Sequence, residues 1–456
     1  MIRHIAVIDV GKTNVKLALV RAMDMEEVAV LTRSNQVINA APYPHFDVKG
    51  HWTFFLDGLR EFNNLCGVDA ISITTHGACA VLLDQFGNLA TPVLDYEHKA
   101  PDDYARAYDA IRPDFSVTGS PKLKGGLNIG AQLFWLFSQD PNLRDKVTHI
   151  VTYPQYWGYL LTKELACDVT SLGCHTDLWN PHEGIFSTLV DKLKIKDKIA
   201  PLRHCDAVLG TVLESITEAT GLTAATPVYL GIHDSNASLL PHILARVEPF
   251  SVVSTGTWVI AMAMGGKDVK LDPDKDTLMN VNALGKSVKS ARFMGGREFE
   301  IVLGGAHIPV KPRHIIKVLE QKIMLFPSLQ ADTGPFQGRS ATWHGCEPNL
   351  GSGERATAAS FYLALVTAHC LSLIGHQGEI IVEGPFSLDL AYLQMLSAAT
   401  NAPVIASKNS TGTSTGAALL VLGGKDFKSA SDAPVTAPNE FSSYAADWHT
   451  MVMSAI

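Results

Sequence analysis

The stretch Ile5-Ala-Val-Ile-Asp-Val-Gly-Lys-Thr-Asn-Val-Lys-Leu-Ala-Leu-Val20 decides the fold. Apolar residues flank a short polar turn, and this pattern predicts two paired strands. Gly11 lets the backbone at the turn approach a phosphate closely, while the N–H and O–H groups beside it can donate hydrogen bonds. Asp9 can hold Mg²⁺ directly or through water, although an Asp is also common in turns for local hydrogen bonding. The hairpin is therefore a candidate phosphate and Mg²⁺ site.

A second stretch has the same form: Phe250-Ser-Val-Val-Ser-Thr-Gly-Thr-Trp-Val-Ile-Ala-Met262, with Thr255, Gly256 and Thr257 at its turn. Two such hairpins in the two halves of one chain indicate a duplicated fold that closes on a nucleotide. Elsewhere, strand-like segments such as 68–74 alternate with helix-like segments such as 129–137, which implies α/β layers.

Together these segments resemble the FGGY family of carbohydrate kinases, within the actin-like, sugar-kinase and heat-shock ATPase superfamily. The first turn is similar to the family's Asp-x-Gly-Thr opening, with Lys12 where Thr or Ser is more usual. Tyr229-Leu-Gly-Ile-His-Asp-Ser-Asn-Ala237 resembles the segment that carries the family's catalytic base. Residues 380–386 and 412–418 stand where the family binds adenosine. The resemblance implies two actin-like (ribonuclease-H-like) α/β domains, about 1–243 and 244–456, with a catalytic cleft between them.

The resemblance also implies a reaction: ATP-dependent transfer of the γ-phosphoryl group to a hydroxyl of a small sugar, either a ketose (pentulose or hexulose) or a polyol. Such a transfer needs a base near the hydroxyl, Mg²⁺ on the phosphates and fixed donors around the developing charge. Asp234 is the candidate base and a second candidate Mg²⁺ ligand. It follows a strand-like stretch and opens a helix-like one, where α/β proteins place ligands. The other interpretation of Asp234 is a helix cap.

The sugar site is expected in segments that depart in part from the family. Thr74-Thr-His-Gly-Ala-Cys-Ala-Val-Leu-Leu-Asp84 is similar to a sugar-contacting segment of the family's ketose kinases, which tend to have His at the position of His76. Pro92-Val-Leu-Asp-Tyr-Glu-His-Lys-Ala100 stands where the family has Leu-Trp-x-Asp-x-Arg, and it differs at every diagnostic position. The identity of the sugar is therefore left open.

Carboxylates in the 92–100 segment can still bind a sugar, because each carboxylate can accept several hydrogen bonds from hydroxyl groups. The candidate sugar contacts are His76, Asp95, Glu97, Lys99, Gln155 and Asp234. A charged surface turn is the other interpretation of the 92–100 segment.

The candidate nucleotide contacts share a place in a turn or a run of small residues: Gly11, Lys12, Thr13, Asn14, Thr255, Gly256, Thr257, Gly384 and Gly416. No P-loop is present around Lys12, because position 6 is Ala where that motif needs Gly. Lys12 either contacts a phosphate or is solvated. Pro385 and Phe386 replace more usual Gly residues, which would narrow an adenine pocket. For the Gly-rich 293–298 segment a surface loop is the default.

Composition excludes some partners. The net charge of −8 and the pI of about 6.1 argue against a nucleic-acid binder, which usually shows a basic face. Seven cysteines without a Cys-x-x-Cys pair predict free thiols in a reducing cytosol. We find no targeting leader and no apolar run of about 20 residues, so we expect a cytoplasmic protein without a membrane partner. Whether it forms a homodimer is left open. The segment 267–289 is polar and is expected to be rich in loops, and 424–440 is expected to be a surface loop.

Two other functions are weighed against the kinase. Gly412-Thr-Ser-Thr-Gly416 matches the nucleophile elbow of α/β-hydrolases, which would make Ser414 a nucleophile with Asp426 or Asp432 and His449. A non-catalytic actin-like nucleotide-binding protein would use the same fold for ATP-driven closure. The candidate base Asp234 and the candidate sugar contact His76 argue against the latter.

Overall fold

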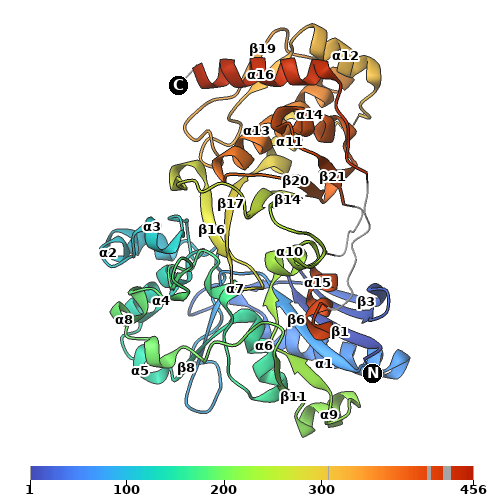
Figure 1. Cartoon of the computed structure of the whole chain (residues 1–456). Helices are drawn as coiled ribbons and strands as arrows, with labels where there is room; N and C mark the ends of the chain where they lie inside the picture. The colour runs from blue at the N-terminus through green and yellow to red at the C-terminus, as the bar shows by residue number, and fades with distance from the viewer. Residues whose placement is uncertain (1, 307, 408–411, 425–432, 455–456) are drawn as a thin grey trace. The chain divides into compact units, whose positions relative to one another are not determined.

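The computed structural model describes residues 2–306, 308–407, 412–424 and 433–454 (Figure 1). The chain forms two compact units. The first comprises residues 1–245, 279–287 and 411–429, and the second comprises 246–278, 288–410 and 430–456. The chain thus changes unit between Ala245 and Arg246, and two short later segments belong again to the first unit.

The first unit is built on a mixed sheet. Strands β1 (His4–Val10) and β2 (Asn14–Arg21) pair antiparallel as the sequence predicts, with Asp9 opposite Lys16. On its other edge β1 pairs in parallel with β6 (Ala70–Thr75). The strand order is β11 (Val208–Thr211), β12 (Pro227–Tyr229), β6, β1, β2 and β3 (Glu26–Ser34), with β13 (Ile232–His233) also paired to β6.

Both faces of this sheet are buried. Ala6, Ile8 and Val10 of β1 belong to a core that includes residues of α1 (Val48–Cys66) and α6 (Tyr153–Thr162). Ile5 and Val7 pack with residues of α15 (Gly412–Leu422). Because successive side chains of a strand point to opposite faces, helices cover the sheet on both sides, as in doubly wound α/β folds. Ligands of such folds bind beyond the carboxyl ends of the parallel strands, where Asp9 lies near the end of β1 and where His76 and Asp234 follow β6 and β13.

Further helices and strands complete the first unit. Helix α10 (Asp234–Ala245) packs against α15, and α4 (Ile129–Gln139) and β7 (Ala80–Leu83) lie where the sequence predicts them. The remaining main elements are β4 (Val37–Ile38), β5 (His45–Phe46), α2 (Ala105–Asp109), α3 (Phe115–Thr118), α5 (Leu143–Lys146), β8 (His149–Thr152), α7 (Val169–Leu172), β9 (Trp179–Asn180), β10 (Ile185–Phe186), α8 (Leu189–Lys192) and α9 (Glu214–Thr220).

The second unit repeats the same plan. Strands β14 (Phe250–Thr255) and β15 (Val259–Met264) form the second predicted hairpin, and β14 pairs in parallel with β20 (Glu379–Glu383), as β1 does with β6. Strand β17 (Ser287–Phe293) extends the sheet beyond β15, and β21 (Val404–Ala406) extends it beyond β20. The duplicated actin-like α/β fold is thereby confirmed.

Helices of the second unit bury a long apolar element. Helix α13 (Gly353–Leu373) is long and apolar enough to cross a membrane by length and composition, but 78% of its apolar window is buried inside the protein, as in a core helix. The elements around it are α11 (Gly295–Leu303), α12 (Pro312–Glu320), α14 (Leu390–Thr400), α16 (Asn439–Ser454), β18 (Met324–Phe326) and β19 (Thr342–His344).

Two loop expectations differ from the structure, one of them only in part. The 267–289 segment contains β16 (Thr277–Val281) and the start of β17, because Leu278, Met279 and Val281 are all buried. The 293–298 segment is not a surface loop but opens α11. Its Glu298 is 2% exposed and accepts hydrogen bonds from the Tyr362 hydroxyl (2.7 Å) and the Gln330 N–H (2.9 Å). Much of the predicted 424–440 loop lies outside the described residues.

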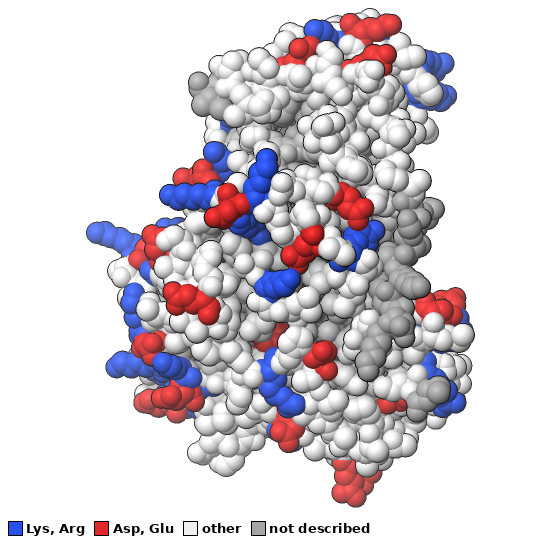
Figure 2. Space-filling view, in the orientation of Figure 1, with Lys and Arg blue, Asp and Glu red and all other residues white. Residues whose placement is uncertain are grey.

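Charged side chains of both signs are interspersed over the face shown in Figure 2. With a net charge of −8, this is unlike the one-sided basic face of a nucleic-acid binder.

Candidate active site

Asp9 lies at the carboxyl end of β1, where three charged or polar groups meet. Its Oδ2 accepts a hydrogen bond from the Thr413 hydroxyl (2.9 Å) and lies 3.6 Å from the Lys16 ammonium. Burial raises the pKa of Asp9 to about 6, against the lowering effects of Lys16 and Thr413, and the negative charge of Asp234 raises it further. The two carboxylates are thus close enough to interact, and a divalent cation would stabilise both in their ionised forms.

Asp234 is the first residue of α10. Its Oδ1 accepts a hydrogen bond from the Ser235 backbone N–H (2.6 Å) and lies 3.2 Å from His233 Nε2. Burial raises the pKa of Asp234, while neighbouring His76 and the Ser235 hydrogen bonds oppose the rise. A raised pKa makes a carboxylate a better proton acceptor, which suits a general base.

The segment before Asp234 is fixed by buried polar groups. Burial lowers the pKa of His233 to about 4, so its ring is neutral at pH 7 and its Nε2–H can donate to Asp234. The backbone N–H of His233 donates to the Thr170 hydroxyl (3.1 Å), which donates in turn to Asp168 (2.7 Å). These contacts make His233, Thr170 and Asp168 candidate positioning residues for the base.

Gln155 belongs to the same support. It is fully buried, and its amide N–H group donates to the backbone carbonyls of Leu230 (3.1 Å) and Gly231 (3.2 Å). Its Oε1 is hydrogen-bonded to the Thr152 hydroxyl. With its amide committed to the backbone just before β13, we expect Gln155 to position Asp234 rather than to contact a sugar.

The buried setting of Asp168 can be tested by the pH dependence of the free energy of unfolding. It caps α7 through the Ser171 N–H (2.8 Å), and burial raises its pKa from 3.8 to about 6. The folded state therefore binds the proton more tightly than the unfolded state, so this residue's contribution to the free energy of unfolding falls as pH rises from about 4 to about 6. Asp168→Asn caps helices equally well and cannot ionise. Relative to wild type, its free energy of unfolding should rise by up to about 3 kcal/mol between pH 4 and pH 7. Urea unfolding at both pH values measures this, and a difference independent of pH would contradict it.

The His76 ring lies in an aromatic surround, and one of its nitrogens has no hydrogen-bond partner among the described residues. Its ring lies 5.2–5.3 Å, centroid to centroid, from the rings of Phe46, Tyr96 and Tyr153. Burial lowers the pKa of His76 to about 4, so the ring is neutral, and Nδ1–H can donate to the Gly77 carbonyl (2.8 Å). Nε2 is then a buried acceptor that has no hydrogen-bond partner among the described residues. A sugar hydroxyl would satisfy it.

Lys12 lies beside that aromatic surround. Its ammonium pairs with the Asp95 carboxylate and lies 3.3 Å from Glu97 Oε2. It also lies 5.0 Å and 4.7 Å from the ring centroids of Phe46 and Tyr96. The structure therefore brings Lys12 together with the predicted sugar segment.

The other residues of the two segments are placed differently. Thr13, Asn14 and Lys99 are exposed. Gly11 closes the hairpin turn through its N–H and the Asn14 carbonyl (2.9 Å), and a Cβ at Gly11 would crowd that same oxygen. The turn thus requires glycine for close backbone approach.

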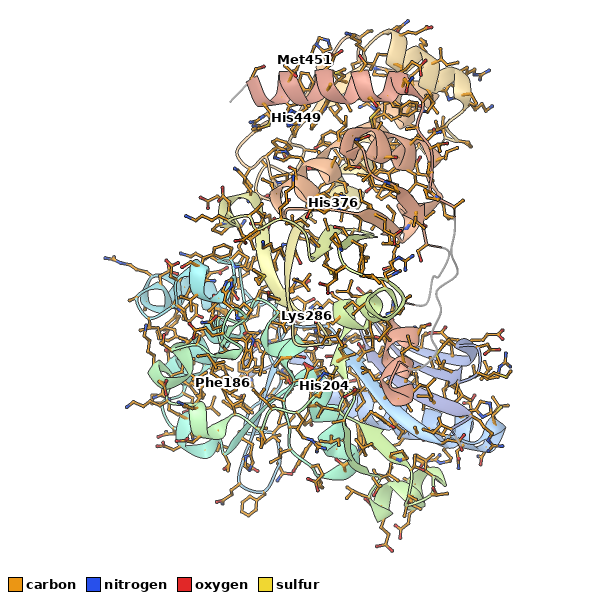
Figure 3. The ribbon with its side chains drawn as sticks, viewed as in Figure 1. Phe186, His204, Lys286, His376, His449 and Met451 are labelled. Atoms are coloured by element: carbon orange, nitrogen blue, oxygen red, sulfur yellow. The ribbon has the colours of Figure 1, made fainter. Side chains whose placement is uncertain are left out.

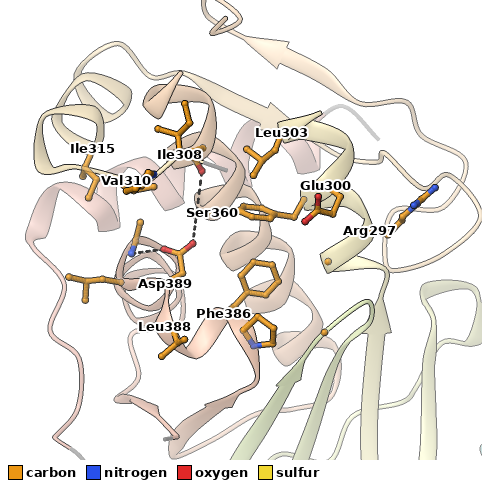
Figure 4. Close-up of a pocket in the computed structure, with 18 of the residues that line it drawn as sticks. Arg297, Glu300, Leu303, Ile308, Val310, Ile315, Ser360, Phe386, Leu388 and Asp389 are labelled. Carbon is orange, nitrogen blue, oxygen red and sulfur yellow. Dashed lines mark hydrogen bonds between the residues drawn. The ribbon is translucent and has the colours of Figure 1, made fainter. Parts of the chain in front are cut away.

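In the second unit, a pocket of about 960 Å³ (Figure 4) is lined by two of the predicted nucleotide contacts, Gly256 and Thr257. Its walls include Gly256, Thr257, Arg297, Phe299, Phe386 and Asp389. The Phe386 ring meets Phe299 edge-on at 5.1 Å and stacks on Tyr392 at 5.4 Å, and Asp389 accepts a hydrogen bond from the Ser360 hydroxyl (2.6 Å). The size and the largely apolar walls are typical of a small-ligand site.

Gly384 and Thr255 lie next to Pro385 and Phe386, which line this pocket. Gly384 has φ +78°, and a Cβ there would collide with the Thr255 carbonyl. The Thr255 hydroxyl bonds to the Glu383 carbonyl and accepts from the Phe386 N–H (3.1 Å). The sequence assigns both residues to the nucleotide, and their contacts tie β14 to the segment that carries Pro385 and Phe386.

Gly416 has a different setting. It is buried in α15, where a Cβ would collide with the Ala237 carbonyl of α10. Close packing of two helices accounts for this glycine, and its contact with adenosine stays a prediction.

The hydrolase interpretation finds no support in the described residues. Ser414 is fully buried inside α15, whereas a nucleophile elbow exposes its serine at a strand-to-helix turn. His449 lies on α16 (Figure 3), with its ring 6.3 Å from the His369 ring. Asp426 and Asp432 lie outside the described residues.

Sequence reasoning missed Lys16 and Thr413. Lys16 could have been found, because residues equally far from a hairpin turn face each other, and Asp9 pairs with Lys16. Thr413 reaches Asp9 only through tertiary packing. Among the described residues no group of three His, Cys, Asp or Glu side chains could hold a metal. Mg²⁺ in phosphate-transfer sites is commonly held by one or two carboxylates with phosphates and waters, which Asp9 and Asp234 fit.

Comparison with known proteins identifies the family. The model of the N-terminal domain of the FGGY family of carbohydrate kinases matches residues 4–241, and the model of the C-terminal domain of carbohydrate kinase FGGY matches residues 247–430. The crystal structure of a carbohydrate kinase from Novosphingobium aromaticivorans is 32% identical, with a TM-score of 0.92 over 100% of this chain and 99% of that one. A ligand-bound xylulose kinase from Lactobacillus acidophilus shares the fold, with a TM-score of 0.82 and 15% identity over 99% of this chain and 97% of that one.

Curated relatives match over a shorter span. The L-fuculokinase of Salmonella typhi is 26% identical over 279 residues, which are 58% of this chain and 57% of the relative. The chain thus matches little more than half the length of that relative. The two family models together cover most of the chain, and this protein belongs to the FGGY family of carbohydrate kinases.

Proposed function

We propose that the protein is an ATP-dependent kinase that phosphorylates a hydroxyl of a small sugar or polyol, with Asp234 as the general base. One observation carries the proposal: the Asp234 carboxylate, whose side chain is 29% exposed and whose pKa is raised, is held at a helix N-terminus near enough to Asp9 and to His76 for electrostatic interaction with both. A non-catalytic nucleotide-binding protein would not need Asp234, Asp9 and His76 close together.

The reaction follows from these positions. The acceptor hydroxyl gives its proton to the Asp234 carboxylate while its oxygen bonds to the γ-phosphorus of ATP. The bond from that phosphorus to the β–γ bridging oxygen breaks, and ADP leaves. His233 and Ser235 hold Asp234 Oδ1, so the other carboxylate oxygen can turn to the hydroxyl.

Asp9 would hold Mg²⁺ directly, as an oxygen ligand of a hard cation, and Asp234 would reach the ion through a bound water, so that its carboxylate stays free to take the proton. The bound ion would supply positive charge at the phosphates. The raised pKa of Asp9, which burial produces, supports a site that favours a cation.

The pocket of the second unit is the proposed place of the adenosine, with Gly256 and Thr257 near its phosphates. Gly11, Thr13 and Asn14 stay predicted phosphate contacts. Nucleotide binding in a cleft between the domains and a cytoplasmic location also stay predictions.

A coupled ADP-release assay over ketoses, aldoses, polyols and aldonates tests the function. We expect at least one uncharged acceptor to raise ADP release well above the rate with ATP alone, and excess EDTA to abolish it. ADP release that no acceptor changes, or full activity in EDTA, would refute the proposal.

A further inference from the structure

Lys12 lies in a cluster of polar and aromatic side chains. A role in phosphate binding would not require such partners. The cluster consists of Lys12, Asp95, Glu97, Phe46, Tyr96 and His76. The ammonium of Lys12 pairs with two carboxylates and faces two rings, so its charge is already balanced before any ligand binds. A lysine reserved for phosphate would gain little from such partners, because each carboxylate repels the phosphate that the lysine attracts.

The cluster nevertheless has capacity for a ligand. His76 is 5% exposed and carries a buried acceptor that has no partner in the part of the chain that the structure describes. Asp95, whose side chain is 10% exposed, retains lone pairs beyond its contact with Lys12, and a lysine has three N–H donors. A ligand with several hydroxyl groups could donate to His76 and Asp95 and accept from Lys12.

The charges around the cluster decide which ligands fit. Asp95, Glu97 and Asp234 contribute three negative charges, Lys12 contributes one positive charge, and the His76 ring is neutral at pH 7 because burial lowers its pKa to about 4. The balance is negative. A carboxylate on the acceptor would meet like charges, and like-charge contacts suppress binding of the wrong partner.

We propose that Lys12 is a specificity-determining residue of the acceptor site. Lys12 and Asp95 together bind hydroxyls of an uncharged acceptor, and the surplus of carboxylates around them excludes sugar acids. This inference rests on the proposed kinase function. It assigns Lys12 to the sugar, whereas the sequence left Lys12 either in contact with a phosphate or solvated.

Steady-state kinetics on the full-length protein test the inference. The variants are Lys12→Met, Lys12→Arg, Asp95→Asn and Glu97→Gln, with Lys49→Met, an exposed lysine of α1, as the matched control. Loss of charge-assisted hydrogen bonds typically changes affinity by about 10–100-fold. We therefore expect Lys12→Met to raise the acceptor KM by about that factor while the ATP KM changes less than about threefold. Lys12→Arg should retain part of the affinity. The side chain of Glu97 is 65% exposed, so Glu97→Gln should have a small effect.

Acceptor choice gives an independent readout. For Asp95→Asn, which removes one negative charge, kcat/KM for an aldonate relative to the best uncharged acceptor should rise by about tenfold or more. Thermal melting of each variant confirms folding. The inference is overturned if Lys12→Met raises the ATP KM and spares the acceptor KM, or if the wild type uses aldonates as well as uncharged acceptors. If the wild type turns over no acceptor at all, the proposed function itself has failed, and the inference falls with it.

Discussion

Asp234→Asn should lower kcat by about 10²–10⁴-fold, which is roughly 3–5 kcal/mol of barrier, because Asn cannot take the proton of the acceptor hydroxyl. Asn has nearly the same shape and still accepts hydrogen bonds, so Ser235 and His233 can hold it as they hold Asp234. The KM values for ATP and acceptor should therefore change little. Initial-rate kinetics at saturating ATP, Mg²⁺ and acceptor measure the effect.

The alternative role of Asp234 as a mere helix cap makes the opposite prediction, since Asn caps helices as well as Asp does. Asp114, which caps α3 through the Ser116 N–H (2.8 Å), provides the same substitution at a cap outside the site. Asp114→Asn should keep the wild-type kcat. If Asp234→Asn keeps more than about a tenth of the wild-type kcat, Asp234 is not the base.

Asp9→Asn should weaken the use of Mg²⁺ and stabilise the fold at the same time. Loss of one carboxylate should raise the Mg²⁺ concentration for half-maximal activity by about 10–100-fold or more, the range seen when support of a metal site is removed. A Mg²⁺ titration of the initial rate measures this. Asn keeps an oxygen for the Thr413 hydroxyl, so the local contact survives.

The stability effect follows from the pKa of Asp9, which burial raises from 3.8 to about 6. The folded state holds this proton more tightly than the unfolded state, so ionisation of Asp9 costs stability as pH rises from about 4 to about 6. Without Mg²⁺ at pH 7.5, Asp9→Asn should raise the free energy of unfolding by up to about 3 kcal/mol. An unchanged Mg²⁺ requirement, or a less stable variant under these conditions, would contradict the role of Asp9.

The hairpins and the long helix were predictable because their signals are local. In β1–β2 and β14–β15 the apolar residues flank a polar turn with Gly11 or Gly256, and α13 is a continuous segment rich in Ala and Leu. The passage from strand to helix at Asp234 likewise lies within a few residues. Such patterns survive without knowledge of tertiary contacts.

The setting of other residues depends on contacts far along the chain. The sequence does not distinguish the roles of Gly11 and Gly416. In the structure, any Cβ at Gly416 would collide with the Ala237 carbonyl of another helix. Gln155 lies in an aromatic run, and only the approach of residues 230–231 commits its amide to the backbone. Lys12 follows Gly11 as a phosphate-binding lysine would, but folding brings Asp95 to it from 83 positions away. Local patterns do not contain these pairings.

The products of one complete reaction test the account most directly. The wild-type protein with ATP, Mg²⁺ and its best uncharged acceptor should yield one sugar monophosphate ester for each ADP, as followed by phosphorus NMR and mass spectrometry, with little free phosphate. The same reaction with Asp234→Asn should yield neither at a comparable rate. Conversion of ATP to ADP and free phosphate at the same rate with or without acceptor, or no conversion with any acceptor, would contradict the account.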